Sequence, residues 1–162
     1  MWMSQSATSA KSTGSEPTMS DRTASLSSGT FAPTIRKFCA EHGWDIFRIG
    51  DDLAALQFEG GTGTEYTVIV FLFEGTLEFS VATPVRFASE GVIPRRLATW
   101  LLCRSSGMKV GFWAIEDKDD EFIVSAMHRV ESRLVDSEHF GMVVRLLIKS
   151  CNEFEAEVED IE

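Results

Sequence analysis

Apolar residues follow the spacing of α-helices in three segments of the chain. The first covers residues 30–43, where a threonine cap precedes the apolar stripe and a glycine follows it. The second covers residues 94–107 and begins with a proline, and the third is a long segment capped by Asp136 or Ser137. The three stripes consist of Phe31, Ile35, Phe38 and Cys39; of Ile93, Leu97, Trp100 and Leu101; and of Phe140, Val143, Val144, Leu147, Cys151, Phe154 and Val158.

Shorter runs with the pattern of β-strands lie between these helices. The strongest is residues 66–73, whose apolar side chains are β-branched, aromatic or leucine. Residues 44–58 contain two runs split by Gly50, Asp51 and Asp52, which predicts either one bent strand or a small hairpin. The predicted strands are residues 44–49, 53–58, 66–73, 76–82, 110–116 and 121–127.

The order of these elements predicts the fold class. Helices come before, between and after strands that are joined by short turns, in the order α-β-β-β-α-β-β-α. Strands connected by hairpins pair antiparallel, and helices segregated from them pack on the resulting sheet. We therefore expect an α+β domain with an antiparallel sheet of about five strands and flanking helices.

The start of the chain differs from the rest in composition. Serine and threonine make up 14 of the first 30 residues, and apolar side chains larger than alanine are few. Such a stretch cannot bury enough surface to offset the entropy lost on ordering. We expect a disordered leader over residues 1–29 and a single domain over residues 30–162. An organelle transit peptide is the alternative for the leader, and Met19 is an alternative start.

The charge of the chain limits its partners. With 25 acidic against 15 basic side chains the formal net charge is −10, and this charge repels phosphate backbones and anionic lipids. The sequence contains no run of 18 apolar residues and no export signal. We therefore expect a cytoplasmic protein that binds neither nucleic acid nor a membrane.

Three groups of residues that suggest a metal or phosphate site lack the spacing such a site needs. Cys39, Cys103 and Cys151 are too far apart for a zinc site, and we expect them to be buried or semi-buried thiols within helices. The acidic run 116–121 lacks the glycine and the final carboxylate of a calcium loop. The glycines at 60–63 lack the lysine of a phosphate loop, so they are more plausibly a connector.

Catalytic signatures are missing as well. His42, His128 and His139 are scattered along the chain, and no G-x-S-x-G motif is present. We expect no catalytic residues, no cofactor and no metal.

The middle of the chain resembles a known family. Residues 92–116 read VIPRRLATWLLCRSSGMKVGFWAIE and are followed by an acidic turn, a strand and a terminal helix. This segment is similar to the YbjN family of bacterial proteins, in which a Pro-initiated helix, a short linker, a Gly-aromatic strand and an acidic hairpin recur. The resemblance extends over about residues 30–158 and implies the fold of type III secretion chaperones. One departure is Arg104-Ser105-Ser106, where the family often carries an asparagine.

The turn at Glu74-Gly75 sets the faces of the central hairpin. A two-residue turn there pairs Phe73 with Thr76 and every earlier residue in step. One face then carries the core, consisting of Val68, Val70, Leu72, Leu77, Phe79 and Val81. The other face carries Ile69, Phe71 and Phe73, where water is expected.

The second predicted hairpin, formed by residues 110–116 and 121–127, has the same property. Pairing Glu116 with Glu121 makes both faces apolar. Either helices cover both faces, or a misplaced turn has exchanged them, or the second face binds a subunit or another protein. On the last reading Ile69, Phe71 and Phe73 are the candidate partner or dimer surface.

These observations favour a non-enzymatic protein-binding or chaperone-like, regulatory module of the YbjN type. We expect it to form a homodimer or to hold a client segment of another protein. The alternative within the same fold is a true type III secretion chaperone that holds an effector segment. The alternative of another class is a small enzyme or ligand sensor with dispersed site residues.

Overall fold

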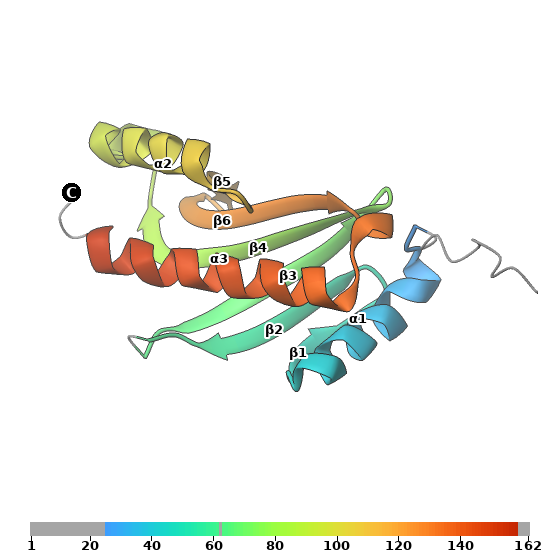
Figure 1. The fold of residues 1–162 in the computed structure, drawn as a ribbon. Helices are drawn as coiled ribbons and strands as arrows, with labels where there is room; N and C mark the ends of the chain where they lie inside the picture. Colours follow the sequence, from blue (N-terminus) through green and yellow to red (C-terminus); the bar gives the residue numbers. More distant parts are fainter. Residues whose placement is uncertain (1–24, 62, 159–162) are drawn as a thin grey trace, which may run out of the picture.

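Over residues 25–61 and 63–158, which the computed structural model describes, the chain forms three α-helices and a six-stranded antiparallel sheet (Figure 1). The α+β class and the element order agree with the sequence prediction. The helices are α1 (Ser28–His42), α2 (Arg95–Gly107) and α3 (Ser137–Val158). The strands are β1 (Ile46–Ile49), β2 (Leu53–Glu59), β3 (Glu65–Phe73), β4 (Thr76–Phe87), β5 (Phe112–Lys118) and β6 (Glu121–Glu131), and two short 3₁₀ turns are Glu90–Val92 and Ser132–Leu134.

The strands lie in the order β1-β2-β3-β4-β6-β5, and each pairs antiparallel with its neighbour. The sixth strand arises because the chain reverses direction after Ile49, so that β1 and β2 form a hairpin rather than one bent strand. Strand β5 is at one edge of the sheet and β1 is at the other. The long strand β4 changes register against β6 between Ala82 and Arg86.

The hydrophobic core lies between the sheet and the helices. Phe140 of α3 contacts Phe38 of α1 and Phe79 of β4, with ring centroids 5.4 and 5.6 Å apart. The stripe predicted for the long helix is buried from Phe140 to Phe154. Burial of such side chains contributes about 1.5–3 kcal/mol each, so this interface is the main source of stability.

The N-terminal boundary of the folded part lies earlier than the sequence suggests. Helix α1 begins at Ser28, and its cap is Ser27 instead of Thr30. The backbone N–H of Leu26 donates to Ser132 Oγ at 2.9 Å, and the Leu26 side chain packs on the core. Residues 25–29 are therefore part of the domain, and the predicted boundary at residue 29 is wrong by about five residues. Residues 1–24 lie outside the described part of the chain.

Two N-terminal truncations should differ in stability. We expect deletion of residues 1–24 to leave the melting temperature unchanged. Deletion of residues 1–29 should lower it by several degrees, because it removes the Ser27 cap and the Leu26 contacts, which together contribute about 1–3 kcal/mol. Differential scanning calorimetry on both variants checks this. Equal melting temperatures for the two deletions would show that residues 25–29 contribute nothing.

The register of the central hairpin agrees with the prediction. Phe73 pairs with Thr76 and Val68 with Val81, and both turn residues, Glu74 and Gly75, have the positive φ angles of a tight two-residue hairpin turn. The face assignment for this hairpin is therefore confirmed.

The β5–β6 hairpin has a shorter turn than predicted. The turn is Asp119-Asp120, both with positive φ, so Lys118 pairs with Glu121 and Glu116 pairs with Ile123. The predicted pairing of Glu116 with Glu121, which places residues 117–120 in the turn, is therefore wrong. The observed register differs from the predicted one by two positions along β6. Because side chains alternate between the two faces with a period of two, this shift moves no side chain from one face of the hairpin to the other.

Candidate functional site

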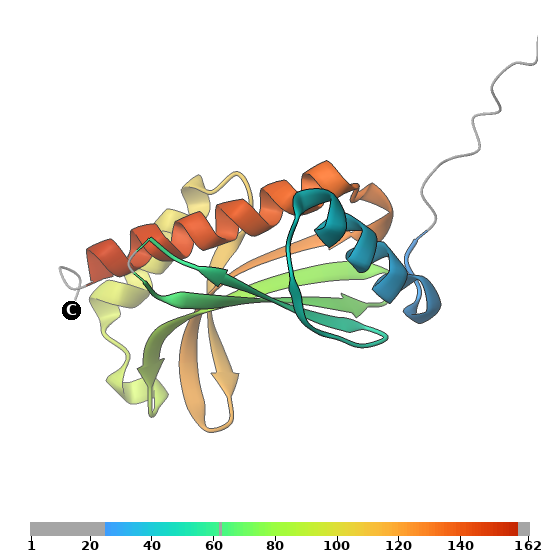
Figure 2. The same ribbon diagram turned by 90° about the horizontal axis from the view of Figure 1, so that it is seen from below.

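One face of the sheet has no helix on it among the described residues. Helices α1 and α3 lie on the opposite face (Figure 2), and α2 joins them there through Trp100, which contacts Trp113 and Phe154. The interpretation that helices cover both faces is therefore wrong for residues 25–61 and 63–158. We call the uncovered side the open face; it carries Leu53, Ala55, Ile69, Phe71, Phe73, Glu78, Ser80, Phe112, Ala114, Glu116, Ile123, Ser125, Met127 and Arg129.

The open face is concave. Ala55, Ile123 and Met127 are buried although they do not belong to the core under the helices. Ser80 of β4 donates to Glu116 of β5 at 3.2 Å, whereas two strands that are not direct neighbours lie about 10 Å apart in a flat sheet. The end of β4 and the β5–β6 hairpin bend away from the helices (Figure 2), which brings these side chains together.

The β2–β3 half of the open face is an apolar strip. Phe73 is 61% exposed, and its ring lies parallel to that of Phe71 at a centroid distance of 6.4 Å. Ile69 and Phe71 are half-buried, and Leu53 pairs with Phe71 across the strands. The structure therefore brings the three predicted surface residues, Ile69, Phe71 and Phe73, onto one uncovered strip. Their use in binding stays a prediction.

The β4–β6–β5 half of the open face is polar and contains Glu116. Its carboxylate accepts hydrogen bonds from Lys118 Nζ at 2.7 Å and from Ser80 Oγ at 3.2 Å. Burial by itself would raise the pKa of Glu116, but the polar contacts with Lys118, Ser125 and Ser80, together with the charge of Lys118, outweigh burial and lower it. Glu116 therefore stays ionised in a nearly buried position, which the sequence analysis did not foresee.

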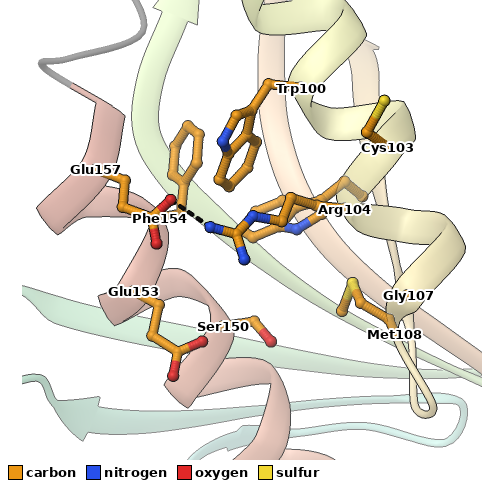
Figure 3. Close-up of a pocket in the computed structure, with 10 residues that line it drawn as sticks. Trp100, Cys103, Arg104, Gly107, Met108, Ser150, Glu153, Phe154 and Glu157 are labelled. Carbon is orange, nitrogen blue, oxygen red and sulfur yellow. Dashed lines mark hydrogen bonds and ion pairs between the residues drawn. The ribbon is translucent and has the colours of Figure 1, made fainter.

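A second hollow, of about 230 Å³, lies between α2 and α3 (Figure 3). The ring of Trp100 lies beside that of Phe154, and the Arg104 guanidinium lies 4.9 Å from the Trp100 ring centre and pairs with Glu157. Cys103, exposed on α2, also lines this hollow. The Arg104 guanidinium in this hollow is therefore already paired within the chain.

The three cysteines are all in helices, but only two are buried. Burial raises the pKa of Cys39 to about 11 and, with the nearby charge of Glu155, that of Cys151 to about 12. Both thiols are therefore protonated and unreactive at neutral pH. Cys103 is exposed, so the expectation of three buried or semi-buried thiols is wrong for this residue, because α2 contacts the fold along one narrow side.

The structure brings together two of the three histidines. His128 of β6 and His139 of α3 lie with ring centroids 6.2 Å apart, whereas His42 stacks on Trp44. The backbone N–H of Gly111 donates to His128 Nδ1 at 3.2 Å, so the neutral ring carries its proton on Nε2. Burial, followed by the neighbouring His139, lowers the pKa of His128 from 6.5.

This arrangement predicts how stability depends on pH. Because the unfolded chain takes up a proton on residue 128 at higher pH than the folded chain does, stability is full above pH 6.5 and falls as the pH drops below it. In the variant His128→Asn the amide oxygen can replace Nδ1 as the acceptor of the hydrogen bond from Gly111. The asparagine side chain does not titrate. We expect the variant's loss of stability between pH 7.5 and pH 5 to be smaller than that of the wild type, as measured by urea unfolding. An equal loss in both proteins would contradict the assignment.

No metal centre or membrane span is formed by residues 25–61 and 63–158. Within these ranges no three side chains of histidine, cysteine, aspartate or glutamate come together as a metal site would require. None of the helices there is long and apolar enough to cross a bilayer.

Comparisons with known proteins relate the chain to one solved fold. No protein-family model and no curated protein matches it. It is similar to the crystal structure of YbjN from E. coli, a candidate transcription regulator, with a TM-score of 0.54 and 17% sequence identity over 77% of this chain and 91% of that one. The chain has a YbjN-like fold. The resemblance in residues 92–116 is thus confirmed at the level of the fold, and at this identity the YbjN likeness carries no residue roles.

Proposed function

We propose that this chain is a non-enzymatic protein-binding module of the YbjN type, and that it docks its partner on the open face of the sheet. The observation that carries the proposal is the apolar strip of Ile69, Phe71 and Phe73 on a face that no described helix covers. Soluble proteins rarely leave contiguous apolar strips of this kind without a binding role.

The form of the open face fits a protein partner better than a small molecule. It is a broad concave surface built from five strands, with apolar side chains along β2 and β3 and polar ones along β4, β6 and β5. An apolar patch bordered by polar groups is the usual composition of protein interfaces. A second copy of the chain and a client segment of another protein are the two kinds of partner that this surface would accept.

A role in regulation is compatible with this proposal. YbjN is described as a candidate transcription regulator, and a protein-binding module can influence transcription through other proteins. Direct binding to DNA would require a cationic surface, whereas this chain has a net charge of −10.

The proposal is tested by comparing three baits in quantitative affinity capture. They are the wild type, Phe71→Asp on the open face, and the matched control Leu102→Asp, whose leucine is 73% exposed on α2. A true partner should bind the wild type and the control equally and lose most of its binding to Phe71→Asp. The partner is then purified, and its affinity for the three variants is measured by calorimetry.

Self-association is measured in parallel by sedimentation velocity. A dimer that Phe71→Asp dissociates and Leu102→Asp leaves intact would support the proposal. If the wild type stays monomeric and no purified protein discriminates Phe71→Asp from the control, the open face is not a docking surface.

A further inference from the structure

Two of the ion pairs on the open face have the same arrangement. In the first pair Glu116 is 15% exposed and Lys118 is 51% exposed; in the second Glu78 is 29% exposed and Arg129 is 59% exposed. In both cases the carboxylate lies deep in the face and the cation lies at its rim. The floor of the concavity therefore presents two carboxylates, and the cations paired with them lie nearer to solvent.

Glu116 is the deeper of the two carboxylates. Its strand partner is the buried Ile123, and Ser80 and Ser125, both buried, lie beside it. Removing a carboxylate from water is costly, and the fold has already incurred this cost. A cation that approaches Glu116 from outside therefore gains the attraction at low dielectric constant without further desolvation of the carboxylate.

Lys118 is a weak competitor for this position. It is the last residue of β5 before the Asp119-Asp120 turn, and half of its side chain is in water. An ion pair with an exposed, flexible member is weakened by solvent screening and by the side-chain entropy lost in holding it. Lys118 can therefore move aside or share the carboxylate when another cation arrives.

The apolar strip lies directly next to this carboxylate. Ser80 pairs with Ile69 across β3 and β4, and the same serine donates to Glu116. One side chain thus separates the acidic floor from the apolar strip. A peptide that contacts both Glu116 and the apolar strip needs a cationic and an apolar side chain on the same side of its backbone. Such side chains are about two residues apart in a strand, or three to four residues apart in a helix.

We propose that the open face binds a segment of another protein that carries a lysine or arginine beside apolar side chains, with the cation held by Glu116 and the apolar groups held by Ile69 and Phe71. This rests on the proposed function and specifies its partner. The net charge of −10 supports it, because a chain of this charge attracts cationic segments and repels acidic ones. A second copy of this chain fits less well, since it carries the same net charge.

A phage-displayed library of random 12-residue peptides tests this inference. The library is selected on the wild type, on Glu116→Gln, on Phe71→Asp and on the matched control Glu90→Gln, whose glutamate is exposed outside the open face. Circular dichroism verifies that each variant is folded. We expect wild type and control to select peptides that combine lysine or arginine with aromatic or aliphatic residues.

The variants should separate the two parts of the site. Glu116→Gln should still select apolar peptides but lose the enrichment in lysine and arginine, and Phe71→Asp should select none of these peptides. A synthetic peptide chosen on the wild type should bind Glu116→Gln about 10-fold or more weakly in calorimetry. Changing its cation to glutamate should abolish binding to the wild type and restore binding to Glu116→Lys.

The outcomes distinguish the two levels of the proposal. Apolar peptides without enrichment in cations would overturn this inference and leave the proposed function standing. A dimer that occupies the open face and is unaffected by Glu116→Gln would do the same. If the wild type selects no peptides, or selects the same ones as Phe71→Asp, and no dimer forms, both proposals fail.

Discussion

Val70→Asp should unfold the protein, whereas Phe71→Asp, one position further along β3, should leave it folded. Val70 has no exposed surface and lies in the core under the helices. A carboxylate there would be buried without a partner, which costs several kcal/mol of a total stability of about 5–15 kcal/mol. Phe71 is half-buried on the open face, so an aspartate at that position can reach water.

Far-UV circular dichroism and thermal melting of the two variants check this pair. Ile69→Asp, on the same face as Phe71, should also fold, with a small loss of stability. Val70→Ala is the variant to use if Val70→Asp is not recovered, and it should lower stability by about 1–3 kcal/mol. If Phe71→Asp loses its structure as fully as Val70→Asp while the wild type is monomeric, the open face is covered by the chain itself and the interface proposal is wrong.

Gly111→Ala should lower the free energy of unfolding by about 2–4 kcal/mol. Gly111 precedes β5 with a φ of +85°, which residues with a side chain rarely adopt. A Cβ atom there would lie 2.8 Å from the carbonyl oxygen of Met127 and 2.9 Å from a methyl group of Leu147. The backbone would have to shift, and the shift would disturb the hydrogen bond from the Gly111 N–H to His128.

Urea unfolding of Gly111→Ala and Gly107→Ala makes the comparison. Gly107 is the last residue of α2, its φ is not positive, and a Cβ atom there would meet nothing within 4 Å. Gly107→Ala should therefore be neutral or slightly stabilising, because alanine favours the helix. Similar stability for the two variants would show that the position before β5 tolerates a side chain and that glycine is not required at residue 111.

Local backbone geometry accounts for the elements that the sequence predicts correctly. The register of the β3–β4 hairpin depends on a turn of two adjacent residues, Glu74 and Gly75, and it was predicted correctly. The apolar stripe of α3 depends on the spacing of 3.6 residues per turn, and its members from Phe140 to Phe154 are buried as expected. The error at residues 25–29 occurred where serines, which are typical of loops, are held by contacts with the distant Ser132. The error at residues 117–118 occurred because aspartate and lysine are typical of turns, whereas here they extend the β5–β6 hairpin by pairing with Phe122 and Glu121.

The sequence by itself determined which side chains share a face, and therefore that Ile69, Phe71 and Phe73 lie together opposite the core. Strand alternation is a property of the backbone and needs no information on other elements. Only the tertiary structure decided that the helices leave this face open and that its curvature brings Ser80 to Glu116, two strands away. It also decided that His139 of α3 packs beside His128 of β6. These contacts depend on how a twisted sheet bends and where distant helices dock, and no local pattern in the sequence specifies either.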